Sequence, residues 1–133
     1  MIVVDTNLIG YLLLTSDHST QAEQVLRRDP AWAAPLLWRN ELRSVLALYL
    51  RKQLLALADA QAIMNEAVRL MHGREYEVAS EQVFSLAVNS TCSAYDCEFV
   101  ALASDLGVPL VTLNKQLLRQ FPQVALSLEQ FLS

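Results

Sequence analysis

The sequence contains few of the residues that interrupt a folded chain. Among its 133 residues are only three glycines and four prolines, and because no stretch is rich in either, we find no linker. Charged residues make up only 18%, against 53% hydrophobic residues, which excludes a disordered chain. The apolar surplus favours an exposed apolar patch, and hence a protein partner. A chain of this length can bury a substantial core, so we expect one domain over residues 1–133.

The chain also has little with which to build a disulfide or a zinc site. Cys92 and Cys97 are its only cysteines, five residues apart across an expected helix start, where they would point to different sides. We therefore expect no disulfide, and a cytoplasmic location fits better than an oxidising one. Two cysteines are too few for a zinc site, and His18 and His72 show no ligand spacing.

No uninterrupted apolar stretch approaches the roughly 20 residues needed to span a bilayer, so we expect no membrane association. Only three apolar residues separate Met1 from Asp5, and no basic segment precedes them, so we expect no signal peptide. The net charge of −4 argues against a protein that holds nucleic acid mainly by its overall field. An RNA substrate is still compatible with it, because bound cations would reverse the local sign at an acidic site.

Short apolar runs alternate with longer amphipathic segments along the chain. The runs predict strands at residues 2–4, 32–34, 75–78, 109–112 and 124–126. The segments between them predict helices at residues 6–14, 19–28, 36–52, 59–72, 80–88, 93–106 and 115–121. This alternation predicts an α/β fold, with a short-stranded parallel sheet covered by helices on both faces.

Four positions place an acid, or an acid's amide, at the edge of an apolar run. They are Asp5, Glu41, Asp96 and Asn114. A carboxylate beside a core is costly unless a charged or hydrogen-bonding group meets it. Because the carboxylates come from distant segments, one shared divalent cation is the simplest partner. Asp5 and Asn114 each follow an expected strand, and the carboxyl ends of parallel strands form the usual ligand crevice. A metal-dependent enzyme is the leading interpretation.

Each of these positions also has a structural interpretation. Asp5 and Asn114 are good N-cap residues, and Asp96 lies three residues after Ser93, as in a capping box. Glu41 is the most informative, because no basic residue lies three or four positions away to form the usual helical ion pair. Glu98 lies about 200° around the helix from Asp96, so we interpret it as a solvated acid.

Basic and aromatic residues near these acids could contact a phosphate substrate or its bases. The basic residues are Arg39, Arg43, Lys115 and Arg119, and the aromatic residues are Trp38 and Tyr95. The ordinary interpretation is that the basic residues are solvated and that the aromatic residues pack against the core or its rim. We assign Arg39, Arg43 and Lys115 a role in positioning substrate.

Several motifs follow one another in a fixed order. An apolar strand leads into Asp-Thr-Asn at residues 5–7, and Pro35, directly before the helix expected at residues 36–52, precedes Glu41 by six residues. Tyr-Asp-Cys-Glu-Phe-Val-Ala-Leu-Ala at residues 95–103 is followed by Gly-Val-Pro-Leu-Val-Thr at residues 107–112. This set resembles the PIN-domain nucleases over nearly the whole chain. Among them the chain is most similar to the small VapC-like toxin ribonucleases of prokaryotic toxin–antitoxin pairs.

The resemblance implies a PIN-like three-layer α/β/α fold and an endoribonuclease that uses Mg²⁺ or Mn²⁺. Asp5, Glu41 and Asp96 match the family's metal-binding acids. The small polar residue Thr6 and the strand-end Thr112 match further positions of the motif. The resemblance also implies a homodimer and an antitoxin partner, whose tail packs along apolar helices and can place a basic side chain in the acidic pocket.

The chain departs from the family at Asn114, where many members have a fourth aspartate. One carboxylate fewer weakens a second metal position. In the expected mechanism the ion lowers the pKa of its bound water and neutralises charge on the phosphate, while Asn114 and Thr112 position water or substrate.

Other classes of function stay open at this point. A PIN-like protein that has lost catalysis would act only through its partner, and Asn114 favours this alternative. A phosphoryl-transfer enzyme with Asp5 as nucleophile is disfavoured, because Asn7 stands where a second acid is normally needed. A receiver domain is disfavoured as well, because Asp5 has no acidic neighbour before Asp17.

Overall fold

The computed structural model describes residues 1–133 and contains five strands and eight helices. In chain order the first six elements are β1 (Ile2–Val4), α1 (Thr6–Leu13), α2 (Ser19–Arg28), β2 (Trp32–Pro35), α3 (Trp38–Arg51) and α4 (Leu57–Leu70). The others are β3 (Glu75–Tyr76), α5 (Ser80–Val88), α6 (Ala94–Leu106), β4 (Leu110–Val111), α7 (Lys115–Gln120), β5 (Ala125–Leu126) and α8 (Leu128–Leu132).

All five strands run parallel in one sheet, in the order β3-β2-β1-β4-β5. β1 is the central strand: Val3 pairs with Ala33 of β2 on one side and with Leu110 of β4 on the other. Its residues are fully buried, as expected for a parallel strand covered on both faces. The chain builds outward from β1 to β2 and β3, then crosses back to β4. The strand order therefore reverses between β1 and β4, where α/β sheets form their ligand crevice.

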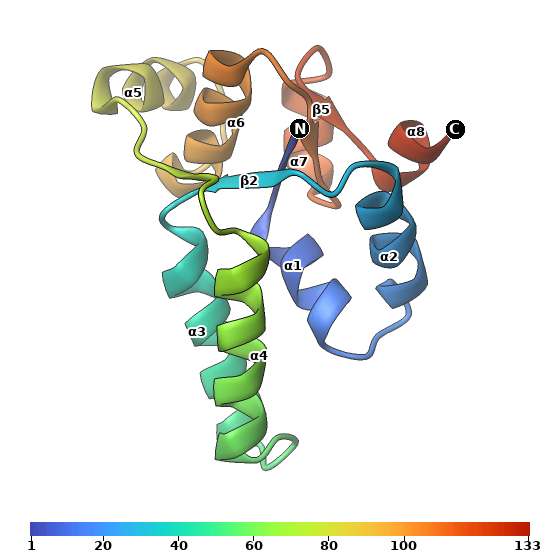
Figure 1. The fold of residues 1–133 in the computed structure, drawn as a ribbon. Helices are drawn as coiled ribbons and strands as arrows, with labels where there is room; N and C mark the ends of the chain where they lie inside the picture. The colour runs from blue at the N-terminus through green and yellow to red at the C-terminus, as the bar shows by residue number, and fades with distance from the viewer.

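Helices flank the sheet on both faces (Figure 1), which confirms the predicted α/β/α architecture. α6 packs against β1, β2 and β4, and its buried residues include Phe99 and Val100. In Figure 1, α5 and α6 lie on the opposite side of β2 from α1 and α2. α3 and α4 pack side by side and project together from the body of the molecule.

Side-chain hydrogen bonds to Glu75 hold the start of α3 against β3. Arg39 makes two hydrogen bonds to the carboxylate of Glu75, from Nε at 2.6 Å and from Nη2 at 2.7 Å. The indole Nε1 of the fully buried Trp38 donates to the same carboxylate at 2.9 Å. These bonds fix the helical turn from which Glu41 projects.

The observed elements differ from the predicted ones mainly at their ends. β3 is only two residues long, against the four expected at residues 75–78. α4 begins at Leu57, two residues before the expected start, and no side chain caps it. Cys92 lies before α6 and Cys97 within it, and both thiols are free. None of the helices has the length and apolar character needed to cross a membrane.

Candidate active site at the carboxyl edge of the sheet

Asp5 lies between the end of β1 and the start of α1, so it is both the N-cap of α1 and a residue of the crevice. Its Oδ1 accepts a hydrogen bond from the backbone N of Leu8 at 3.0 Å, which satisfies one of the open donors of the helix start. Its Oδ2 accepts a hydrogen bond from the hydroxyl of Thr112. The pairing of Val4 with Val111 in neighbouring strands brings these two side chains together. The carboxylate of Asp5 therefore caps α1 with one oxygen and faces the crevice residue Thr112 with the other.

The Asp5 carboxylate is buried, and no basic side chain forms an ion pair with it. Only 7% of the residue is exposed, and it takes part in none of the ion pairs of the protein. Burial raises the pKa of Asp5 to about 6, and the negative charge of Asp96 adds to the rise. The hydrogen bonds from Thr112 and Leu8 lower the pKa, but by less than burial raises it. A positive charge in the crevice would relieve this cost.

Glu41 projects from the first turn of α3 toward α1. It is half-buried, and its Oε1 accepts a hydrogen bond from the hydroxyl of Thr6 at 2.7 Å. Burial is the main cause that raises the pKa of the Glu41 carboxyl, and the charge of Asp96 contributes. Glu41 has no ion-pair partner on its own helix because its side chain faces the interior, toward Thr6 of α1.

Asp96 lies in the first turn of α6 and is half-buried. Ser93 caps this helix by accepting from the backbone N of Asp96 at 3.1 Å. The carboxylate of Asp96 instead accepts a hydrogen bond from Nδ2 of Asn114, at 3.3 Å. Asn114 is also the N-cap of α7, because its Oδ1 accepts from the backbone N of Leu117 at 3.1 Å. The N-cap interpretation of Asn114 is therefore confirmed, whereas the capping box predicted for Asp96 forms only in part: Ser93 caps the helix, but the carboxylate of Asp96 faces Asn114 and not the backbone N of Ser93.

The four residues line one cavity of about 300 Å³. Its remaining wall consists of Thr6, Asn7, Ser44, Val45, Phe99 and Leu117. No lysine, arginine or histidine lines it, and none of the three carboxylates forms an ion pair. We call this the acid cavity.

The acid cavity fits a hard divalent cation by its chemistry. All its charged groups are carboxylates, and oxygen donors are the ligands that Mg²⁺ and Mn²⁺ prefer. The carboxylates do not already form a closed site, because no three acidic, histidine or cysteine side chains are grouped tightly enough to hold an ion. Coordination would therefore use bridging waters or small side-chain rotations, and Mg²⁺ usually keeps several waters in its sites.

Two polar residues of the acid cavity were not among the expected site residues. Ser44 lies three residues after Glu41, on the same face of α3, and this spacing could have predicted that it lines the same cavity. Asn7 completes the Asp-Thr-Asn motif and is exposed. Glu98, by contrast, does not line the acid cavity.

The basic residues expected to position substrate do not line the acid cavity. Arg39 is bound by Glu75, and Arg43 donates to Asn40 at 3.0 Å. Lys115 is exposed at the start of α7, next to Asn114 in the chain. Of the two aromatic residues, Trp38 is fully buried and cannot stack on a base, whereas 64% of Tyr95 is exposed.

The chain is similar to known proteins over nearly its full length. The family model described as PIN domain matches residues 2–123. Ribonuclease VapC3 of Pyrobaculum aerophilum is 28% identical over 124 residues, which are 91% of this chain and 95% of that protein.

Two solved structures share the fold. A toxin–antitoxin complex from Klebsiella pneumoniae has a chain that superimposes with a TM-score of 0.72 at 17% identity, covering 96% of this chain and 98% of that one. VapC20 of Mycobacterium tuberculosis, described as a sarcin-ricin loop cleaving toxin, gives a TM-score of 0.60 at 20% identity, with coverages of 84% and 87%. With its five-stranded parallel sheet and a family match over residues 2–123, the chain belongs to the PIN domain family.

Proposed function

We propose that this protein is an endoribonuclease that uses Mg²⁺ or Mn²⁺ to hydrolyse RNA phosphodiester bonds. The observation on which this rests is the acid cavity, where Asp5, Glu41 and Asp96 meet without a cationic side chain. The similarity to a protein named ribonuclease VapC3 supports the choice of reaction.

The three carboxylates would hold the ion, directly or through water. Such an ion supplies the acidity that activates a water nucleophile at neutral pH and offsets the charge of the phosphate. The protein's own part is orientation: Thr112 holds Asp5, Thr6 holds Glu41, and Asn114 holds Asp96. Because these donors come from elements that are already packed, the three carboxylates are held at the wall of the acid cavity before the ion binds.

The same proposal includes an antitoxin partner, a homodimer and a cytoplasmic location. The similar fold of the Klebsiella pneumoniae toxin–antitoxin complex supports the first of these. A mostly apolar groove of about 360 Å³ between α3 and α4 offers a surface for the partner. Leu57, which lines this groove, is 75% exposed, and the nearby Leu54 is 66% exposed. One of these leucines begins α4 and the other lies in the segment between α3 and α4, and exposed apolar side chains grouped in this way favour a protein contact.

The test is cleavage of single-stranded and structured RNA in the presence of Mn²⁺. We expect Asp96→Asn to lower the rate by about 100-fold or more, the scale on which the loss of one preorganised charged group slows an enzyme. Asp105→Asn is the matched control, because it makes the same change at an exposed position near the end of α6. Equal rates for the wild type and Asp96→Asn would remove the mechanism.

A second candidate function is a PIN-domain protein without catalysis that acts only by binding its partner. The observation that favours it is the hydrogen bond from Asn114 to Asp96, which occupies one carboxylate oxygen with a neutral group. Calorimetric titration with Mn²⁺ separates the two, because an inactive site should bind the ion feebly. The aspartyl-phosphate alternative is disfavoured, since both oxygens of Asp5 already accept hydrogen bonds.

A further inference from the structure

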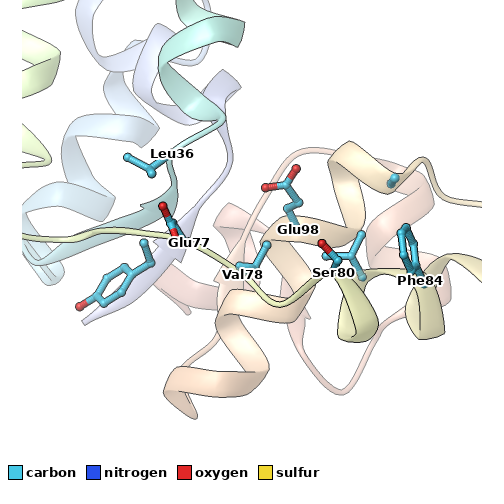
Figure 2. Close-up of a pocket in the computed structure, with 9 residues that line it drawn as sticks. Leu36, Glu77, Val78, Ser80, Phe84 and Glu98 are labelled. Atoms are coloured by element: carbon cyan, nitrogen blue, oxygen red, sulfur yellow. The ribbon is translucent and has the colours of Figure 1, made fainter.

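A second and larger cavity, of about 410 Å³, lies beside the acid cavity. Figure 2 shows it between Leu36, which lies just before α3, the segment that follows β3, and helices α5 and α6. Its lining consists of Leu36, Tyr76, Glu77, Val78, Ser80, Val83, Phe84, Ala94 and Glu98. We call this cavity the base pocket. Its volume lies within the range of roughly 300–1,000 Å³ that is typical of small-molecule sites.

The charged groups of the base pocket can only accept hydrogen bonds when ionised. Glu77 and Glu98 are both without an ion pair, and no lysine, arginine or histidine lines the pocket. In Figure 2, Glu98 extends from α6 toward the segment that carries Glu77. Glu98 is half-buried and Glu77 is exposed. An occupant that fits this pocket therefore has to bring hydrogen-bond donors.

The rest of the pocket is mostly apolar and open at its edge. Phe84 is 64% exposed and Leu36 is 44% exposed, although both are large apolar side chains. Such a surface suits a flat, uncharged aromatic group, because a nucleobase is stabilised by stacking on an aromatic side chain. A solvated cation would gain less from these walls.

The first turns of α6 form a wall shared by the two cavities. Ala94 and Glu98 face the base pocket, whereas Asp96 and Phe99 face the acid cavity. Because the two cavities share this wall, an RNA strand whose phosphate lies in the acid cavity can place a neighbouring nucleotide in the base pocket. This continuity ties the occupant of the pocket to the substrate.

We propose that the base pocket binds an unpaired guanine of the RNA substrate next to the cleaved bond, with Glu98 as the residue that reads the base and Phe84 as the stacking surface. This inference rests on the proposed ribonuclease function. Guanine presents two adjacent donors, N1–H and the N2 amino group, which match the two oxygens of one carboxylate. Adenine and cytosine each place an acceptor beside their amino group, and uracil has one N–H between two carbonyls. Each of these three would leave a carboxylate oxygen facing an acceptor.

The first experiment measures cleavage of short single-stranded RNAs that differ only in the base beside the scissile bond. We expect the wild type to prefer guanine over adenine by about ten- to a hundredfold, the discrimination of a good bidentate contact. Inosine, which lacks the N2 amino group, should be intermediate. Glu98→Gln should bring the preference close to one. Glu81→Gln, an exposed position on α5 outside both cavities, is the matched control and should retain the preference.

The second experiment measures binding without metal, so that it does not depend on catalysis. We expect GMP to shift NMR signals of the base pocket more strongly than IMP, and AMP to have little effect. Glu98→Gln should remove this order, and thermal melts would confirm that the variant is folded. Binding of an N-acetylarginine amide in place of GMP would overturn the inference in favour of a basic peptide.

The two experiments separate failure of the inference from failure of the proposed function. RNA cleavage without preference, together with GMP binding that Glu98→Gln leaves unchanged, would reject the guanine site and leave the nuclease standing. No cleavage of any RNA, together with selective GMP binding that Glu98→Gln removes, would reject the nuclease and leave a guanine site.

Discussion

Asn114 donates a hydrogen bond from its side-chain amide to the carboxylate of Asp96, with 3.3 Å between Nδ2 and Oδ2. The carbonyl oxygen of the same amide caps α7. A neutral residue thus orients one acid of the cavity, at the position where the family resemblance implies a fourth acid. It joins α7 to α6 across the edge of the sheet.

Asn114→Asp should strengthen metal binding. The new carboxylate keeps the cap of α7, because aspartate is as good an N-cap as asparagine, and it adds one negative charge beside Asp96. We expect Mn²⁺ affinity to rise by about tenfold, or roughly 1.4 kcal/mol, because affinity for hard cations follows the number of charged ligands. Calorimetric titration measures the change and also reports any second ion.

Asn114→Ala is the matched control, because it also loses the hydrogen bond to Asp96 but adds no charge. It should bind Mn²⁺ no better than the wild type, and loss of the cap should lower the free energy of unfolding by about 0.5–2 kcal/mol. Equal affinities for Asn114→Asp and Asn114→Ala would contradict a role for ligand charge at this position.

Asp5 should make the stability of the metal-free protein fall as the pH rises. The folded-state pKa is about 6, above the ordinary value of 3.8, so the contribution of Asp5 is most favourable below pH 3.8 and is lost through pH 6. At about 1.4 kcal/mol per pKa unit, the loss is roughly 3 kcal/mol. Urea unfolding in EDTA between pH 4 and pH 8 measures it, with Asp5→Asn as the non-titrating reference. Parallel stability profiles for the two proteins would rule out this contribution.

The hydroxyl of Thr112 should stabilise the protein through Asp5. It donates to Oδ2 of Asp5 and accepts from the backbone N of Asn114 at 3.0 Å, and Thr112 is fully buried. Thr112→Val keeps the shape but leaves both partners unsatisfied, so we expect a loss of about 1–3 kcal/mol in the free energy of unfolding. It should also raise the pKa of Asp5 further. Thr112→Ser restores the hydroxyl and should recover most of the lost free energy of unfolding, as measured by chemical denaturation. If Thr112→Ser were as unstable as Thr112→Val, the hydrogen bonds would be excluded as the cause.

The bond between Arg39 and Glu75 should stabilise the protein above about pH 4.5 and lose its effect below. Hydrogen bonds from Arg39 and Trp38 lower the pKa of Glu75, against the opposing effect of burial. A carboxyl with a lowered folded-state pKa adds stability above its unfolded value, and this is lost as the pH falls through the folded value. We expect Glu75→Gln to be less stable than the wild type at pH 7, and the difference to shrink as the pH falls below 4.5. Thermal melts of both proteins across this pH range measure the difference in stability. A difference that does not change with pH would contradict the prediction.

The sequence predicts the sheet well because its signals are local. The apolar run at residues 2–4 and the later run at residues 109–112 are followed by Asp5 and Asn114, both of which cap helices. Strand, cap and helix are encoded within a few residues, so periodicity and capping rules are enough to place them. The ends of β3 and α4 were missed because pairing and packing set them, not a capping residue.

The side chains around the crevice were harder to assign, because their partners are remote in sequence. Arg39 was expected near the substrate, but Glu75, 36 residues away, binds it. Glu98 was interpreted as a solvated acid, yet it is half-buried and lines the base pocket. A helical angle shows which side of a helix a residue occupies, but the element that covers that side depends on the whole topology.

The order of strands and helices, the polar residues at the strand ends and the lack of a local partner for Glu41 can all be read from short stretches of sequence. The contacts of Thr112 with Asp5 and of Asn114 with Asp96 appear only in the folded protein. The separation of the acid cavity from the base pocket by a turn of α6 is likewise a property of the folded protein. The reason is that hydrogen bonds between distant side chains depend on strand register and helix packing, which arise when the whole core closes and not within any one segment.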